Sequence, residues 1–238
     1  MQIRFGFPGV VASVSSRSDG NMSFIYGSTQ EALENRQHFL SQQGIAYQAL
    51  ICAKQVHGNS VYCATRKDKG RGALTYETAV GDTDSFISNE HEVALAIFTA
   101  DCLSVFLYDP VHSAIGLVHA GWRSTYAKVL ACTVQGMKEA FGTHQSDLQA
   151  GFGPCIRSCC YEVGYDMRDK FPDSVIEKGG KLFLDLALAN RRQLIATGLK
   201  ETAVDDCGVC TSCSSSDFFS FRKEAEKAGR ILSVMMLC

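Results

Sequence analysis

The sequence of 238 residues has few of the features that mark membrane, secreted or nucleic-acid-binding proteins. It contains four prolines and one tryptophan, and its net charge is −2 with scattered lysines and arginines. No apolar run reaches the roughly 18 residues that a bilayer span requires. Gly6, Pro8 and Gly9 interrupt the apolar N-terminal stretch, which argues against a signal peptide. We therefore expect a cytoplasmic protein with no membrane and no nucleic-acid partner.

Several common catalytic motifs are also missing. The sequence has no Gly-x-Ser-x-Gly elbow, no Walker loop and no dinucleotide fingerprint. Nucleotide-editing zinc deaminases need His-x-Glu and Pro-Cys-x-x-Cys, but no histidine precedes x-Glu, and the cysteine after Pro154-Cys155 is Cys159, one residue too far. The six histidines form no His-x-His pair, so a multicopper centre fits poorly and copper is less favoured than zinc.

Cysteine, in contrast, is abundant. Eleven cysteines is an odd number, and the chain is too long to need a disulfide scaffold, so we expect reduced thiols. Cys207, Cys210 and Cys213 are spaced like metal ligands, but the only later cysteine is Cys238 and no histidine follows His144. A closed structural zinc site normally has four protein ligands. We therefore expect free thiols there, with a second metal site as the alternative.

The pattern of apolar residues predicts an α+β fold, a single domain over residues 1–238 with mixed β-sheets flanked by helices. Apolar residues make up 46% of the chain, enough for a full core. Helices are expected at about 29–43, from Ser124 or Thr125 to Gly142, and from Asp185 to before Gly198. Only residues 100–102 separate the expected strands at 93–99 and 103–108, which favours antiparallel or bent pairing between these two strands. The expected strands lie near residues 47–56, 84–88, 93–99, 103–108, 113–118, 148–152 and 231–237.

Three potential metal ligands each follow an apolar, strand-like run. His57 follows residues 49–52, Cys102 follows residues 93–98 and His119 follows residues 115–118. Neighbouring strands would bring the three to one edge of a sheet. Two imidazoles and a thiolate suit a tetrahedral zinc ion and leave one position open for water or substrate, as in catalytic sites. Taken singly, each residue is more simply a surface or core side chain.

Six short motifs occur in order along the chain and together resemble the YfiH family, also called the laccase-domain or polyphenol-oxidase-like family. This family is associated with purine nucleoside phosphorylase activity. The motifs are Gln55-Val56-His57-Gly58, Thr99-Ala100-Asp101-Cys102, His119-Ala120-Gly121-Trp122-Arg123, Gly153-Pro154-Cys155-Ile156, Tyr161-Glu162-Val163-Gly164 and Phe218-Phe219-Ser220-Phe221-Arg222.

The resemblance implies a mononuclear zinc enzyme with His57, Cys102 and His119 as ligands. Its implied substrates are phosphate and a purine nucleoside (adenosine, inosine, guanosine or methylthioadenosine), and adenosine deamination is implied as well. We assign Asp101 to proton transfer. Arg123 and Ser124, at an expected helix start, are assigned to phosphate binding. Ser124 stands where the family usually has glycine, so substrate preference can differ. The oligomeric state has no signature in the sequence.

Two other kinds of enzyme stay open. One is a copper polyphenol oxidase, as the older family name suggests. The other is a metal-free cysteine hydrolase, for example an amidase acting on peptidoglycan precursors, with Cys102 or Cys155 as nucleophile and His119 or His57 as base. A thiolate nucleophile needs no stoichiometric zinc, so metal content discriminates between these possibilities. A non-enzymatic binding module would leave the open metal position without a purpose.

Overall fold

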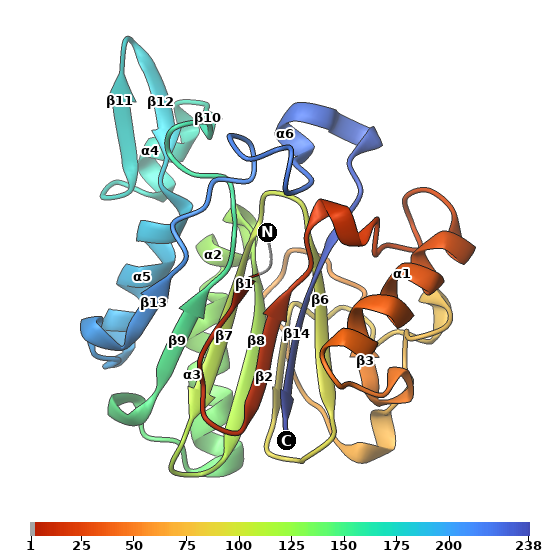
Figure 1. Ribbon diagram of the computed structural model, residues 1–238. Helices are drawn as coiled ribbons and strands as arrows, with labels where there is room; N and C mark the ends of the chain where they lie inside the picture. The colour runs from red at the N-terminus through yellow and green to blue at the C-terminus, as the bar shows by residue number, and fades with distance from the viewer. Residues whose placement is uncertain (1–2) are drawn as a thin grey trace.

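Two central β-sheets lie face to face and helices cover their outer faces in the computed structural model, which describes residues 3–238 (Figure 1). The first sheet has five strands in the order β1-β2-β14-β6-β3. All neighbours pair antiparallel except β3 and β6, which are parallel. Its strands are β1 (Ile3–Arg4), β2 (Val10–Val14), β14 (Ile231–Leu237), β6 (Ala94–Thr99) and β3 (Leu50–Cys52).

The second sheet has six strands in the order β13-β9-β7-β8-β5-β4. The pairs at its two edges, β13 with β9 and β4 with β5, are parallel, and the central pairs are antiparallel. Its strands are β13 (Val204–Asp206), β9 (Gln149–Phe152), β7 (Leu103–Asp109), β8 (Ala114–Ala120), β5 (Ser85–Ser88) and β4 (Val61–Cys63).

The helices and a small third sheet complete the fold. The helices are α1 (Thr29–Gln42), α2 (Trp122–Tyr126), α3 (Val129–Phe141), α4 (Asp166–Lys170), α5 (Leu186–Thr197) and α6 (Phe221–Glu224). The third sheet is antiparallel, in the order β10-β12-β11, and its strands are β10 (Glu162–Val163), β11 (Val175–Lys178) and β12 (Lys181–Leu184). None of the helices in residues 3–238 combines the length and the apolar character that crossing a membrane requires.

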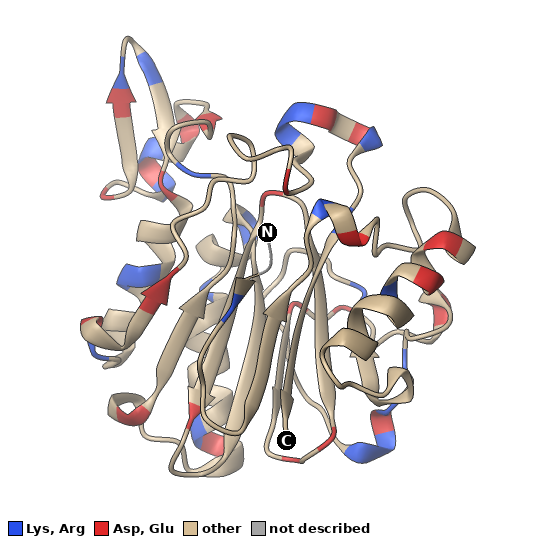
Figure 2. Ribbon diagram, viewed as in Figure 1, with Lys and Arg blue, Asp and Glu red and all other residues tan. Residues whose placement is uncertain are grey.

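Apolar side chains fill three spaces between the layers. Phe106 and Leu117 of the second sheet pack with Leu95 and Met235 of the first sheet between the two sheets. A second cluster lies between the other face of the six-stranded sheet and helices α3 and α5, and a third between the five-stranded sheet and α1. Because both faces of the central strands are buried, their sequences are continuous apolar runs without alternation. Figure 2 accordingly shows charge of both signs concentrated on loops and helices.

The structure confirms the predicted α+β class, with mixed sheets flanked by helices. Helix α1 begins after Ser28, whose hydroxyl accepts a hydrogen bond from the Glu31 amide at 3.3 Å. Helix α5 begins after Asp185, which caps it through the Leu188 amide, and ends at Gly198 in the left-handed conformation. These two boundaries agree with the prediction, because cap residues determine where a helix starts and stops.

The predicted long helix from residue 124 to residue 142 is wrong. The chain forms α2 and α3 instead, with Lys128 at φ 65° between them. Side chains of α5 stabilise this break, since Gln193 donates to the Thr125 carbonyl at 2.6 Å and Asn190 donates to the Thr125 hydroxyl at 3.0 Å. The hydrogen-bonding groups that the break frees are thus satisfied by a distant helix, which local sequence does not reveal.

The expected pairing of the two strands around residues 100–102 is also wrong. Strand β6 pairs with β14 and β3, whereas β7 pairs with β8 and β9. The chain therefore passes from one sheet to the other at Ala100–Cys102. A switch between sheets at this point places Cys102 where the two sheets meet.

Candidate functional site

The three predicted metal ligands meet at one end of the two sheets. Their ligand atoms all lie within 4.8 Å of one another. Strands β3 and β6 are parallel, so the loops that follow them, which carry His57 and Cys102, leave the first sheet at the same end. In the second sheet Leu103 pairs with Ala120, which places His119 beside the start of β7. The predicted convergence is correct, but it is made by two sheets and not by one sheet edge.

The arrangement is open on one side. The rings of His57 and His119 have centroids 4.8 Å apart and planes at 71° to each other. His119 is buried, Cys102 is half-buried and His57 is exposed.

Gly121 lies directly against the ligands, because a Cβ at this position would be 2.9 Å from the Cys102 Sγ and 3.1 Å from the His57 Cδ2. The motif therefore needs glycine at this position to leave the ligands their space.

A fully buried carboxylate, Asp84, orients this group from behind. It accepts hydrogen bonds from His119 Nδ1 at 2.7 Å and from the backbone N–H groups of Val56, His57 and Gly58 at 3.2, 3.0 and 2.6 Å. With Nδ1–H directed at the carboxylate, Nε2 is the His119 atom that can bind a metal. Sequence analysis missed Asp84, whose only signal is an acidic residue directly before a strand.

The loop that carries His57 is also tied to the neighbouring strand. The Gln55 side chain donates to the Phe98 carbonyl at 2.9 Å and accepts from the Phe98 amide at 2.8 Å, as another strand would do. His57 and Asp101 adopt φ values of 60° and 85°, a region that residues other than glycine rarely occupy. Such strained backbone tends to gather at functional sites, where the surrounding structure enforces it.

The electrostatics of the site favour a thiolate. Burial raises the pKa of the Cys102 thiol, but the neighbouring His119 and His57 outweigh burial and lower that pKa to about 6. Burial lowers the pKa of His119, whereas Cys102 and Asp84 raise it to about 9. Asp84 stays ionised because its hydrogen bonds, above all that with His119, overcome burial and lower its pKa. The site therefore offers a thiolate at neutral pH, the form in which cysteine binds metals.

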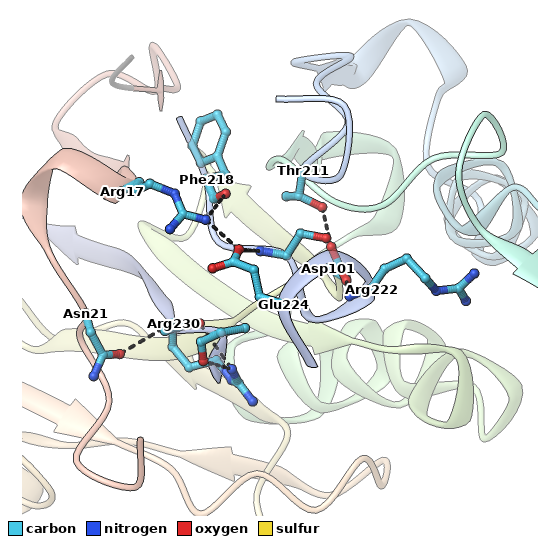
Figure 3. Close-up of polar contacts among 11 residues, drawn as sticks. Arg17, Asn21, Asp101, Thr211, Phe218, Arg222, Glu224 and Arg230 are labelled. Carbon is cyan, nitrogen blue, oxygen red and sulfur yellow. Dashed lines mark hydrogen bonds and ion pairs between the residues drawn. The ribbon is translucent and has the colours of Figure 1, made fainter. Parts of the chain in front are cut away.

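Asp101 lies next to Cys102, and its carboxylate holds a distant segment of the chain in place. One oxygen accepts from the Thr211 hydroxyl at 2.6 Å and the other from the Arg222 backbone N–H at 2.6 Å (Figure 3). The Asp101 carbonyl accepts from the Ile156 amide at 2.8 Å. These contacts make Asp101 an anchor for the loops around the site. Its assigned role in proton transfer stays a prediction.

The two residues assigned to phosphate binding occupy different environments. Arg123 is exposed, and its guanidinium lies 4.3 Å from the centre of the Trp122 ring. Ser124 is fully buried, does not line the cavity beside the ligands, and its hydroxyl has no hydrogen-bond partner among residues 3–238. Because α2 begins at Trp122 with Gly121 as its cap residue, the expected helix start at Ser124 or Thr125 is wrong.

A cavity of about 740 Å³ opens above the three ligands. Its volume lies within the range typical of small-molecule sites. Arg123, Asp101 and Arg222 contribute polar groups to its wall. Flat aromatic rings are frequent in this wall, and flat heterocyclic bases stack on such rings. The aromatic residues of the lining are Phe24, Tyr26, Tyr76, Phe98, Trp122, Tyr161 and Phe221.

Four further cysteines form a second group, away from the three ligands. Cys210 and Cys213 lie with Cys159 and Cys160, and their sulfur atoms are all within 4.8 Å of one another. Cys207 does not belong to this group. The expectation that the C-terminal cysteines lack a fourth ligand is therefore wrong, because a loop some fifty residues earlier supplies two more.

Comparisons with known proteins find one family over most of the chain and relatives named as enzymes. Residues 9–238 match the family described as multi-copper polyphenol oxidoreductase laccase. The chain is 33% identical over 217 residues to the purine nucleoside phosphorylase YlmD of Bacillus subtilis, covering 88% of this chain and 78% of that protein. It is 27% identical over 207 residues to adenosine deaminase RL5 of an unknown prokaryotic organism, covering 83% and 79%.

The fold agrees as well. The crystal structure of YlmD from Geobacillus stearothermophilus superposes with a TM-score of 0.94 at 30% identity, covering 99% of this chain and 96% of that one. The crystal structure of a Bacillus licheniformis protein titled YfiH superposes with a TM-score of 0.92 at 29% identity, covering 96% and 93%. The family match over nearly the whole chain and these relatives show that the chain belongs to the YfiH family of laccase-like proteins.

Proposed function

We propose that this protein is a zinc-dependent purine nucleoside phosphorylase, which cleaves a purine nucleoside with phosphate to the free base and ribose 1-phosphate. The observation that carries the proposal is the convergence of His57, Cys102 and His119 within 4.8 Å beside an aromatic-lined cavity. The relatives named purine nucleoside phosphorylase support the same activity.

The donor set fits one zinc ion better than several copper ions. One thiolate and two imidazoles, backed by the buried Asp84, are the ligands and the supporting carboxylate typical of catalytic zinc sites. A multicopper centre needs many imidazoles, but the other four histidines lie outside both ligand groups found in residues 3–238. His112, for example, bonds to Asp109 at 2.8 Å, and His91 bonds to the Cys238 carbonyl at 2.6 Å.

The residues around the cavity have separable roles in this proposal. When bound, zinc would supply a Lewis acid at the open position of the site. The aromatic residues of the cavity wall hold the purine by stacking. Arg123 binds phosphate and orients it so that a phosphate oxygen attacks C1′ of the ribose. As the bond from C1′ to the purine nitrogen breaks, its electron pair passes to the base, which takes up a proton. Asp101 would relay that proton from the monoanionic phosphate or from water to the base, and one of its carboxylate oxygens would first have to release the Thr211 hydroxyl or the Arg222 amide.

Adenosine deamination is a second candidate activity of the same cavity, supported by the relative named adenosine deaminase. It exchanges the amino group of adenine for oxygen from water and needs no phosphate. The two activities therefore differ in their dependence on phosphate and on Arg123.

One observation supports a cysteine hydrolase as the alternative function. Cys102, His119 and Asp84 form a thiolate–imidazole–carboxylate series like that of cysteine hydrolases. This interpretation gives no role to His57, whose ring also faces the thiolate. Zinc binding uses all three side chains, and for this reason we favour it.

The test is to purify the protein without chelators, measure its zinc, and incubate it with a panel of purine nucleosides with and without phosphate. We expect phosphate-dependent release of base and ribose 1-phosphate, and loss of both zinc at this site and activity in Cys102→Ala. Base release that does not depend on phosphate, or full activity of the metal-free protein, would contradict the proposal.

A further inference from the structure

Two loops that are far apart in the sequence bring four cysteines together. Cys159 and Cys160 lie between β9 and β10, and Cys210 and Cys213 lie between β13 and α6. The four sulfur atoms are all within 4.8 Å of one another. Neither loop has a role in the ligand group formed by His57, Cys102 and His119, so this cluster needs an explanation of its own.

The distances fit four ligands around one ion. Zinc–sulfur bonds of about 2.3 Å in a tetrahedron place the sulfur atoms about 3.8 Å apart. Cys213 Sγ lies 3.5 Å from Cys159 Sγ and 3.4 Å from Cys160 Sγ. Disulfide bonds require about 2.05 Å between two specific sulfur atoms. Cys213 is about equally close to two partners and bonded to neither, and all four cysteines are free thiols in the structure.

Backbone contacts hold the two loops in register beside the cluster. Cys155 and Cys210 form an isolated parallel bridge, in which the Cys155 amide donates to the Val209 carbonyl at 3.3 Å and the Thr211 amide donates to the Cys155 carbonyl at 3.1 Å. Within the second loop the Ser214 amide donates to the Cys210 carbonyl at 2.9 Å, which makes a tight turn of Cys210-x-x-Cys213. This spacing is one of those common in structural zinc sites.

The local charges suit a cluster of thiolates. Four thiolates around a divalent cation leave two negative charges. The Arg222 guanidinium lies beside the first loop, where it donates to the carbonyls of Cys160 and Glu162 at 3.4 and 2.9 Å. A positively charged group beside the cluster offsets part of this negative charge.

We infer that Cys159, Cys160, Cys210 and Cys213 bind one zinc ion in a closed, four-sulfur site. All four positions of the tetrahedron are filled by the protein, so the ion has a structural role and no place for substrate. Soft thiolate donors in tetrahedral number favour zinc over harder cations. The inference concerns a second metal and does not depend on the proposed phosphorylase activity.

This ion would fix the loops that form part of the cavity wall. Tyr161 follows directly after Cys160, and both Tyr161 and Arg222 line the cavity. In the second loop Thr211 lies between the two cysteines and bonds to Asp101 (Figure 3). A cross-link between the loops would therefore position side chains that line the cavity without itself touching the substrate.

The test counts and identifies the metal in variants that isolate each site. The protein and its variants are purified under reducing conditions without chelators. We expect about two zinc ions per chain in the parent, and about one in Cys102→Ala and in Cys213→Ser. X-ray absorption of Cys102→Ala isolates the second ion and should show four sulfur neighbours at about 2.3 Å. Cys207→Ser, a cysteine of the same segment outside the cluster, is the matched control and should keep both ions.

Three results would overturn the inference. One is about one zinc per chain in the parent and none in Cys102→Ala. Another is an absorption spectrum of Cys102→Ala with fewer than four sulfur neighbours. The third comes from protein purified separately without reductant: an intact mass lower by two hydrogens per disulfide, with peptide mapping that places a disulfide among these four cysteines. The measurement on Cys102→Ala keeps the inference testable even where Cys213→Ser fails to fold. Because zinc is counted and not turnover, failure of the proposed phosphorylase activity would leave this test intact.

Discussion

The two cysteine-containing ligand groups differ in number of ligands, in what supports them and in what they face. The group of His57, Cys102 and His119 lies on strand β8 and on the loops that follow β3 and β6, is backed by the buried Asp84 and faces a cavity of about 740 Å³. The group of Cys159, Cys160, Cys210 and Cys213 lies on two loops, with Cys159 and Cys213 exposed. Three ligands leave a position for a reactant, whereas four close the site, so one group suits chemistry and the other suits stability.

The difference in support has a physical consequence. His119 lies in a central strand, and hydrogen bonds to Asp84 and Phe98 tie the His57 loop to both sheets, so a largely preformed site binds its metal without a large ordering cost. The loops of the four-cysteine group are joined by one β-bridge and by side-chain contacts of Arg157 and Arg222, and a bound metal would add a direct link between the cysteines themselves. We expect the removal of metal to change reactivity at the first group and loop order at the second.

The largest expected effect tests whether phosphate binds beside the group of His57, Cys102 and His119, which leaves one metal position open. In Arg123→Ala we expect phosphorolysis to fall by about 2 to 4 kcal/mol of transition-state stabilisation, as for loss of one contact to an oxyanion. Adenosine deamination should fall less, because it needs no phosphate. The measurement is kcat/KM for both reactions at fixed zinc content, with the remote Arg66→Ala as control. Equal losses in the two reactions would instead give Arg123 a general structural role.

The next effect tests whether the buried Asp84 supports the group of His57, Cys102 and His119 through its hydrogen bonds. Asp84→Ala removes the acceptor of four hydrogen bonds, and we expect zinc affinity at this group to fall about 10- to 100-fold. Asp109 is the matched control, since it is equally buried and accepts from His112 and two backbone amides outside both ligand groups. Asp109→Ala should reduce stability but not zinc affinity. Similar losses of zinc affinity in the two variants would mean that the effect comes from the fold alone.

A smaller effect tests whether the ligands need the space that Gly121 leaves beside Cys102 and His57. In Gly121→Ala the new methyl group would press on the Cys102 sulfur and the His57 ring, and we expect this to cost about 1 to 3 kcal/mol. Competition with a zinc chelator measures the loss of affinity. Gly81→Ala is the control, because a Cβ there meets nothing within 4 Å. Unchanged zinc affinity in Gly121→Ala would show that the ligands sit farther from this backbone when metal is bound.

The smallest effect compares single thiols of the two groups in the metal-free protein. The Cys102 pKa is lowered to about 6, whereas the hydrogen bond with Cys160 raises the pKa of Cys213. A lower pKa means more thiolate at neutral pH, so alkylation of Cys102 should level off above about pH 7, one unit above its pKa. Alkylation of Cys213 should still increase with pH there. Peptide mass spectrometry resolves the two rates, and a Cys102 rate that keeps rising tenfold per pH unit would contradict the lowered pKa.

Much of the first ligand group was predictable because its members follow apolar runs. His57, Cys102 and His119 each close such a run, and strand ends meet at the end of a sheet. The caps of α1 and α5 were predictable for a similar reason, since Ser28 and Asp185 act on amides three residues away. Each of these features is marked by a short stretch of sequence: an apolar run before each ligand, or a cap residue close to the amide that it binds.

The remaining features depend on contacts between distant segments, and only the tertiary structure decided them. Asp84 reaches His119 across two paired strands, α5 breaks the predicted long helix at Lys128, and the chain changes sheets just before Cys102. The four-cysteine group joins residues 159–160 to residues 210–213. The C-terminal segment alone therefore shows only two of its four ligands. By itself the sequence determined the central strands β5 to β9 and β14, the ends of α1 and α5 and the three-ligand motif, because local periodicity and capping encode them. The packing of the two sheets determined the rest, because packing brings together side chains whose separation along the chain carries no local signal.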